Sequence, residues 1–244
     1  LRGALAGMLL AGLAIWAAGM IHLRATFPPT TVRLAREFFG FPVAEVFSGL
    51  SATVGFAVLS QADVPLANRL SSPDVAASYA AVAVLGKAIL YLPGGVATAL
   101  FPMVAAVDKQ TRASVSLLYQ SIIITTLGCG LVATAYSLIG KQLVVMVYGS
   151  RYPAAPALLQ HYGWVMLPLA VTFLLNNYFV ALSRLLYPWF VCAAAVLLIG
   201  LGIAFPLSPT AILQTMGLLG TLLCLGGLWL ARFQHPDDSQ PNRS

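Results

Sequence analysis

The sequence predicts an all-α, polytopic membrane protein, and three observations support this fold class. Hydrophobic residues occupy 59% of the 244 positions and charged residues only 8%, against about 25% charged residues in ordinary soluble domains. The apolar runs reach about 20 residues, which is enough to cross a ~30 Å hydrocarbon core as a helix. The alternation typical of barrel strands is absent. Because lipid offers backbone N–H and C=O groups no partner, we expect helices.

The apolar runs define about seven membrane-spanning segments. They cover residues 1–21, 38–61, 74–107, 113–139, 156–183, 187–206 and 208–232. The chain starts at Leu1 inside the first run, without the basic region or cleavage motif of a signal peptide, so we expect it to be the C-terminal part of a longer protein. The last two segments are separated by a minimal turn that contains two prolines, which predicts a tight helical hairpin.

The basic residues of the connections predict the orientation of the chain. Eight lie on one side of the predicted membrane, and four on the other: Arg24, Arg33, Arg36, Lys109, Arg112, Arg184, Arg232 and Arg243 against Arg2, Arg69, Lys141 and Arg151. Basic residues concentrate in cytoplasmic loops. We therefore expect a multi-pass protein of the cytoplasmic (inner) membrane with its C-terminus in the cytoplasm and a polar, disordered tail at 233–244.

The segment 74–107 contains a lysine near its middle and is predicted to be one long, bent helix with a break at Pro93-Gly94-Gly95. At helical spacing, small and polar residues share one face: Ala76, Ala80, Ala83, Lys87, Tyr91, Gly94 and Thr98. Aliphatic residues share the opposite face, which we expect to contact lipid: Val82, Leu85, Ile89 and Val96. Lys87 lies roughly 20 Å along the helix. An intramembrane lysine indicates either substrate contact or a structural ion pair, for which Glu45 is a candidate partner.

Four further polar residues lie in or beside the spanning segments. Glu45 is a candidate for binding a coupling ion or for pairing with a cation. Asn176 and Asn177 lie inside the fifth segment and predict either a helix–helix hydrogen bond or contact with sugar hydroxyls. Asp63, beside Asn68 and Arg69, is interpreted as part of a hydrated cluster that ends the second segment.

Catalytic and cofactor-binding motifs are absent. The sequence lacks a Walker A glycine loop, an HExxH motif and a G-x-S-x-G elbow, and its predicted loops are short. Its three cysteines lie within apolar runs without metal-ligand spacing. We therefore predict no enzymatic activity, no metal and no cofactor. The net charge of +6 is assigned to membrane orientation, so nucleic acid is not an expected partner.

The order of several motifs resembles a known transporter family. Residues 71–107 (SSPDVAASYAAVAVLGKAILYLPGGVATALFPMVAAV) contain Tyr79, Pro93 and Phe101-Pro102; they are followed by VYGSRYPAAPALL and by a helix that ends in ALSR. This pattern is similar to the C-terminal half of Wzx-type polysaccharide flippases, which belong to the multidrug/oligosaccharidyl-lipid/polysaccharide exporter superfamily. The resemblance extends from Phe38 to about Arg232. Ser78 departs from it, because the family often has glycine before this tyrosine.

The resemblance implies one lobe of a two-lobe transporter, in which two six-helix lobes face each other around a central cavity. Residues 1–22 would be the last helix of a missing N-terminal lobe, and residues 23–37 a cytoplasmic linker between the lobes. Residues 38–232 would form the complete C-terminal lobe, followed by the tail.

The same resemblance implies flipping of undecaprenyl-diphosphate-linked saccharides, such as O-antigen units of lipopolysaccharide, by alternating access. Lys87, Tyr91, Thr98, Asn176 and Asn177 are then the candidate substrate-binding residues. Glu45 is a candidate for Na⁺ or H⁺ coupling, and other polysaccharide assembly proteins are candidate partners.

Two other functions remain open at this stage. One is an ion-coupled exporter of small organic cations, similar to the MATE proteins, although that activity favours an acidic cavity and Lys87 opposes it. The other is a membrane-embedded transferase or polymerase that acts on lipid-linked sugars. It would need catalytic residues in a large outer loop, and this sequence has no such loop.

Overall fold

The computed structural model describes residues 43–106, 112–152, 155–184 and 186–233. All regular structure within these ranges is helical, which confirms the all-α fold. The chain divides into two compact units, Leu1–Val46 and Phe47–Ser244. Only the start of one helix belongs to the first unit among the described residues, so the fold below is that of the second. The predicted segment at 1–21, the linker and the tail beyond residue 233 lie outside the described ranges.

Eight α-helices and two 3₁₀ turns follow one another in the described part of the chain. They are α3 (Val43–Gln61), α4 (Asp63–Leu70), α5 (Pro73–Lys87), η1 (Ala88–Leu90), α6 (Tyr91–Ala106), α7 (Arg112–Tyr148), η2 (Gly149–Arg151), α8 (Ala155–Ala181), α9 (Leu186–Ala204) and α10 (Pro209–Phe233). By length and composition they supply six candidate membrane spans: Gly49–Leu70, Pro73–Val104, Ser114–Arg151, Ala155–Ala181, Leu186–Ala204 and Pro209–Arg232. The polytopic character predicted from hydropathy is thus confirmed.

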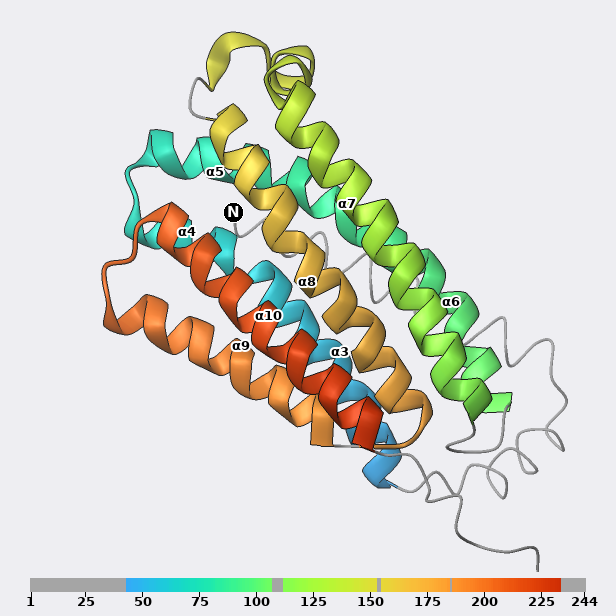
Figure 1. The fold of residues 1–244 in the computed structure, drawn as a ribbon. Helices are drawn as coiled ribbons and strands as arrows, with labels where there is room; N and C mark the ends of the chain where they lie inside the picture. The colour runs from blue at the N-terminus through green and yellow to red at the C-terminus, as the bar shows by residue number, and fades with distance from the viewer. Residues whose placement is uncertain (1–42, 107–111, 153–154, 185, 234–244) are drawn as a thin grey trace, which may run out of the picture. The chain divides into compact units, whose positions relative to one another are not determined.

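The central helix is α8, which packs against α5, α6, α7, α9 and α10. Figure 1 shows it between α7 and α10. Small residues allow these close approaches, as expected where helices associate in lipid. A Cβ at Gly163 would come within 3.1 Å of the backbone of Ala133 on α7, and one at Gly220 of α10 would come within 3.0 Å of Leu169. Substituting larger residues at these positions would therefore separate α8 from its neighbours.

The predicted long helix over 74–107 is interrupted next to its lysine. Helix α5 ends at Lys87, the chain makes one 3₁₀ turn, and α6 begins at Tyr91. Pro93 has no N–H to donate to the carbonyl of Ile89, four residues earlier, and the Cys129 Sγ of α7 lies 3.8 Å from that oxygen. The Tyr136 hydroxyl donates to the Leu85 carbonyl at 2.7 Å. Side chains of α7 thus compensate for an irregular backbone at membrane depth.

One face of this segment was assigned wrongly from the sequence. Val82 and Ile89, which we expected to contact lipid, are buried to 1% and 2% exposure, whereas Val84 is exposed. Both buried residues belong to the main apolar core, together with residues of α7 and α8. Helical spacing groups residues into faces, but it does not show how many faces neighbouring helices cover.

Two helix boundaries also differ from the prediction. Helix α7 continues nine residues past the predicted end at 139, because the exposed Lys141 is a good helix former and does not end a helix. The connection between the predicted segments 113–139 and 156–183 therefore begins only at η2, where Gly149 adopts a φ of 67°, a conformation that favours glycine. After Gln61 the chain forms the additional helix α4, which we did not predict.

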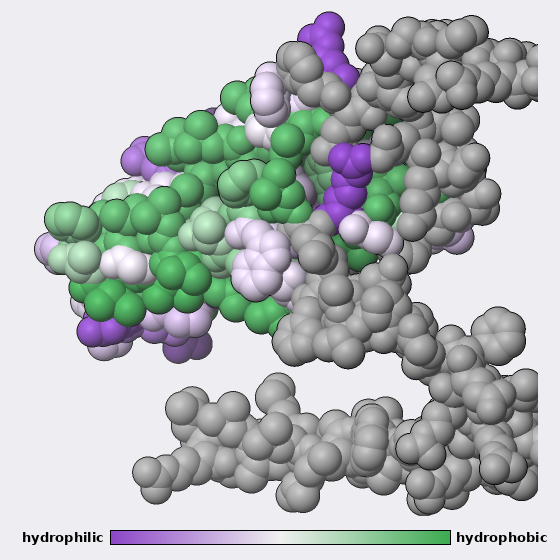
Figure 2. Space-filling model, turned by 90° about the horizontal axis from the view of Figure 1, so that it is seen from below, coloured by the Kyte–Doolittle hydropathy of each residue, from purple (hydrophilic) through white to green (hydrophobic). Residues whose placement is uncertain are grey.

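The predicted C-terminal hairpin is present. Helix α9 ends at Ala204 and α10 begins at Pro209, with four residues between them. Ser208 caps α10, because its Oγ accepts the N–H of Ala211 at 3.2 Å, and proline suits the first helical position. The coloured residues on the face drawn in Figure 2 are mainly hydrophobic, and the hydrophilic ones gather in a few small groups. Such a surface is typical of helices surrounded by lipid.

Candidate functional site

A pocket of about 590 Å³ lies between α3, the junction of α5 with α6, and α8. Helix α3 lines it with Thr53, Phe56, Ser60 and Gln61, among others. The junction contributes Lys87, Leu90 and Tyr91, and α8 contributes Phe173, Asn176, Asn177 and Val180. These segments belong to three different candidate membrane spans. The pocket is therefore a polar and aromatic hollow inside a chain that is otherwise strongly apolar.

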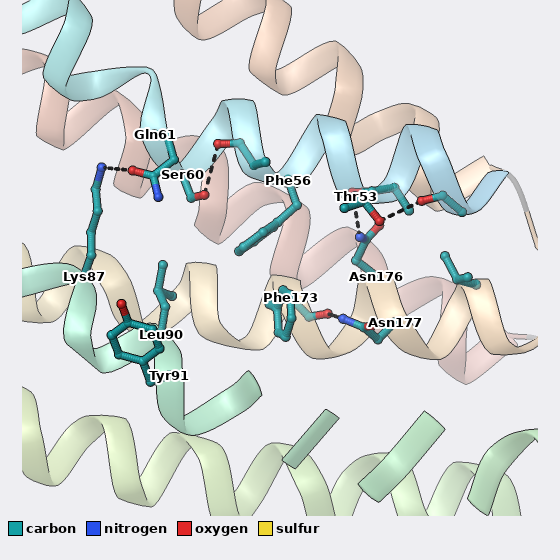
Figure 3. A pocket seen from close by; sticks show the side chains of 14 residues that line it. Thr53, Phe56, Ser60, Gln61, Lys87, Leu90, Tyr91, Phe173, Asn176 and Asn177 are labelled. Atoms are coloured by element: carbon teal, nitrogen blue, oxygen red, sulfur yellow. Dashed lines mark hydrogen bonds between the residues drawn. The ribbon is translucent and has the colours of Figure 1, made fainter. Parts of the chain in front are cut away.

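The polar groups are concentrated at the two ends of the pocket (Figure 3). Lys87 and Gln61 lie at one end and Asn176 and Asn177 at the other, with the rings of Phe56 and Phe173 between them. The two ring centroids are 4.9 Å apart and the rings are tilted by 54°. A ligand that has polar groups at both ends and carbon surface between them would match this arrangement.

The two asparagines make different hydrogen bonds. Asn176 is 4% exposed, and its Nδ2 donates to the Ala52 carbonyl of α3 at 3.0 Å. Its Oδ1 is buried and has no hydrogen-bond partner among the described residues. Among the described residues, Asn177 donates only to the Phe173 carbonyl of its own helix, at 2.8 Å. Asn176 thus connects two helices, while the amide of Asn177 makes no interhelical bond to any described residue.

Lys87 forms an ion pair with Asp63. Its Nζ lies 2.8 Å from Asp63 Oδ1 and donates to Gln61 Oε1, also at 2.8 Å. The Asp63 side chain is fully buried, and that of Lys87 is 13% exposed. An ammonium group has three N–H donors, so two of them are used within the protein. The structural alternative for Lys87 was an ion pair, and the structure provides it with Asp63 as the partner.

Two buried tyrosines complete the environment of Asp63. The hydroxyls of Tyr79 on α5 and Tyr162 on α8 both donate to Asp63 Oδ2, the former at 3.1 Å. Gly86 makes this possible, because a Cβ there would lie only 2.3 Å from the Tyr162 ring. The carboxylate therefore accepts three hydrogen bonds, and it joins the start of α4 to α5 and α8.

The interpretation of Asp63 as a hydrated helix-end residue was wrong, since the carboxylate has no exposed surface. Its partners come from 16, 24 and 99 positions away in the sequence, and no local pattern predicts such pairs. The one available signal was an acidic residue beside a long apolar run, with an intramembrane lysine left unpaired in the next segment.

The remaining candidate residues are distributed as follows. Four of the five candidate substrate-binding residues line the pocket: Lys87, Tyr91, Asn176 and Asn177. Thr98 does not line it; this residue is exposed on α6, and its Oγ1 donates to the Gly95 carbonyl at 2.7 Å. Glu45 belongs to the first turn of α3, but its side chain lies outside the described part. No group of three or more metal-ligating side chains occurs among the described residues.

Comparison with protein-family models, with curated proteins and with solved structures gives no match for this chain. The described part is a helical protein with six candidate membrane spans. The similarity to polysaccharide flippases therefore rests on the sequence motifs alone.

Proposed function

We propose that this chain is part of a transporter that moves an undecaprenyl-diphosphate-linked saccharide across the cytoplasmic membrane by alternating access. The observation that carries the proposal is the pocket described above, which three candidate spans form and which has a lysine at one end and two asparagines at the other. Intramembrane polar residues that line a cavity indicate a substrate pathway rather than contact with lipid.

The two ends of the pocket suit the two parts of this substrate. Lys87 has one N–H donor beyond those used by Asp63 and Gln61, and a charge-assisted bond from an ammonium group to a phosphate oxygen is strong. The amides of Asn176 and Asn177 match sugar hydroxyls as donors and acceptors. Phe56 and Phe173 between them offer surface to the C–H groups of a sugar ring.

A second candidate is an ion-coupled exporter of small organic cations. The observation that favours it is Asp63, a fully buried carboxylate in a candidate membrane span, because acidic residues of this kind bind protons or cations in pumps and transporters. The pairing of Asp63 with Lys87 counts against it, since the two opposite charges cancel.

The test compares two ligands on the purified protein in nanodiscs, an undecaprenyl-diphosphate oligosaccharide and a lipophilic cation. The double variant Asp63→Asn/Lys87→Gln removes both charges of the pair and keeps groups of similar size. We expect the saccharide lipid to bind to the wild type, and to bind about tenfold more weakly to this variant, a difference of about 1.4 kcal/mol. Asn177→Ala is expected to weaken binding as well, and Asn68→Ala, at an exposed position on α4 outside the pocket, is the matched control.

Other outcomes distinguish the two candidates. Binding of the cation but not of the saccharide lipid, with loss of cation binding in the double variant, would favour the exporter. Saccharide-lipid binding that is equal in the wild type and in both pocket variants would exclude this pocket as the substrate site.

A further inference from the structure

A second, apolar hollow lies between α9 and α10, and none of its lining residues belongs to the pocket described above. It has a volume of about 570 Å³. Leu186 and Leu197 of α9 line its two ends, as do Leu230 and Leu219 of the antiparallel α10. Both helices are candidate membrane spans. We call this hollow the α9–α10 groove.

Two adjacent glycines of α10 shape the groove. Gly227 accommodates the buried Tyr187, because a Cβ at position 227 would lie 2.6 Å from that ring. The Tyr187 hydroxyl donates to the Leu223 carbonyl at 3.2 Å, so the ring is held as the floor of the groove. Gly226 also lines the groove, and a Cβ there would meet no atom within 4 Å. The hollow at Gly226 is therefore open space that no side chain of the described residues fills.

The groove has the length of one membrane leaflet. Leu219 and Leu230 are eleven residues apart, which corresponds to roughly 16 Å along a helix. This length is about half of the ~30 Å hydrocarbon core. A chain of hydrocarbon from one leaflet would fill such a groove, whereas a spanning helix from a partner would extend beyond it.

A cation lies just beyond one end of the groove. Trp229 lines both the groove and an adjoining hollow of about 550 Å³, which is also lined by Tyr119, Leu228 and Arg232. Arg232 is exposed in the last turn of α10, and α9 begins at this same end of α10 (Figure 1). Tryptophan and tyrosine beside arginine are typical of the headgroup level of a membrane protein.

We propose that the α9–α10 groove binds one acyl chain of an anionic glycerophospholipid, whose phosphate contacts Arg232. The apolar walls match the chain, the leaflet length matches its extent, and the cation at the interfacial end matches the headgroup. Basic sites between membrane helices at the surface bind anionic lipid headgroups in this way. The inference does not depend on the transport function, because the groove and the pocket have no residue in common.

The test measures lipid retained by the purified protein, by native mass spectrometry in detergent with phosphatidylglycerol or phosphatidylcholine added. Gly226→Leu places a side chain in the groove and should reduce bound phosphatidylglycerol at least tenfold. Gly200→Leu is the matched control, because this glycine of α9 also faces open space and is not among the groove residues. Both changes replace glycine with a better helix former, so a loss confined to Gly226→Leu is local.

The headgroup contact is tested separately with Arg232→Gln. One basic residue near the membrane surface contributes about 1 kcal/mol of attraction to anionic lipid, so this variant should bind phosphatidylglycerol about fivefold more weakly and lose its preference over phosphatidylcholine. Normal phosphatidylglycerol binding by Gly226→Leu, an equal loss in Gly200→Leu, or an unchanged preference in Arg232→Gln would each overturn the proposal. The proposal would also be overturned if the purified protein formed dimers without bound lipid and Gly226→Leu converted them to monomers. The groove would then be an interface between copies of the chain.

Discussion

The Nζ of Lys87 lies 2.8 Å from Oδ1 of Asp63, and the carboxylate has no exposed surface. This pair connects the end of α5 to the start of α4 at the edge of the pocket. A buried ion pair is costly to form, but removing one partner is costlier, because the other charge is left buried without compensation. The pair should therefore control both the stability of the fold and the electrostatics of the pocket.

The first prediction concerns the two charges of this pair. Lys87→Met or Asp63→Leu alone should lower the free energy of unfolding by about 3–5 kcal/mol. The double variant Asp63→Asn/Lys87→Gln should lose much less, because neither charge is then left unpaired. Denaturant unfolding in detergent, followed by circular dichroism, measures the difference. Lys141→Met, at an exposed position on α7, should be nearly neutral, and equal losses in single and double variants would contradict the pairing.

The second prediction concerns the hydroxyls that donate to Asp63. Tyr162→Phe and Tyr79→Phe each remove one hydrogen bond to the buried carboxylate, and a hydrogen bond to a charged group contributes about 1.5–3 kcal/mol. Each variant should lose about this much stability in the same unfolding experiment. Tyr91→Phe, at a position that is 82% exposed, provides the control. If all three variants unfolded alike, the hydroxyl contacts to Asp63 would be unimportant.

The third prediction concerns the glycine that admits Tyr162. Gly86→Ala would place a Cβ 2.3 Å from the tyrosine ring, and overpacking of this kind typically costs about 1–3 kcal/mol. Gly94→Ala, in open space on α6, should instead stabilise the helix by up to about 1 kcal/mol. Thermal melts of the two variants check this difference in sign. A stabilised Gly86→Ala protein would show that α5 and α8 are not in close contact there.

The fourth prediction separates the two adjacent asparagines. Asn176→Ala removes the bond from α8 to the Ala52 carbonyl of α3, and interhelical hydrogen bonds in membranes contribute about 0.6 kcal/mol on average. Asn177→Ala removes only a bond within α8 and should leave stability unchanged. Unfolding in detergent compares them directly. A larger loss in Asn177→Ala would be inconsistent with the geometry.

The position of the helices followed from the sequence because hydropathy acts locally. Runs of about 20 apolar residues have few alternatives to a helix in lipid, and the C-terminal hairpin followed from its short turn and the two prolines in it. The end of α7 was predicted too early, because the apolar run ends before Lys141 and an exposed lysine is a good helix former that lets the helix continue. The face of α5 was predicted wrongly, since burial of Val82 depends on which neighbours pack against it.

The candidate site, too, could be predicted only in part from the sequence. Lys87, Asn176 and Asn177 were identified from the sequence because polar side chains inside apolar helices are costly without a partner. Which partner each one has was decided by the tertiary structure, since a hydrogen bond depends on distance in space. Asp63 was misjudged from its local sequence for this reason, and Tyr162, 99 positions away, was not considered.

The sequence by itself determined that this protein is a bundle of membrane-spanning helices, because chain composition alone sets the free energy of transfer into lipid. Only the tertiary structure decided that Lys87 pairs with Asp63 and that Asn176 bonds to α3. It also showed that Gly226 faces open space in the α9–α10 groove and that Arg232 lines the adjoining hollow. These features depend on how helices approach one another, and that approach is set by small residues and shape complementarity distributed over the whole chain.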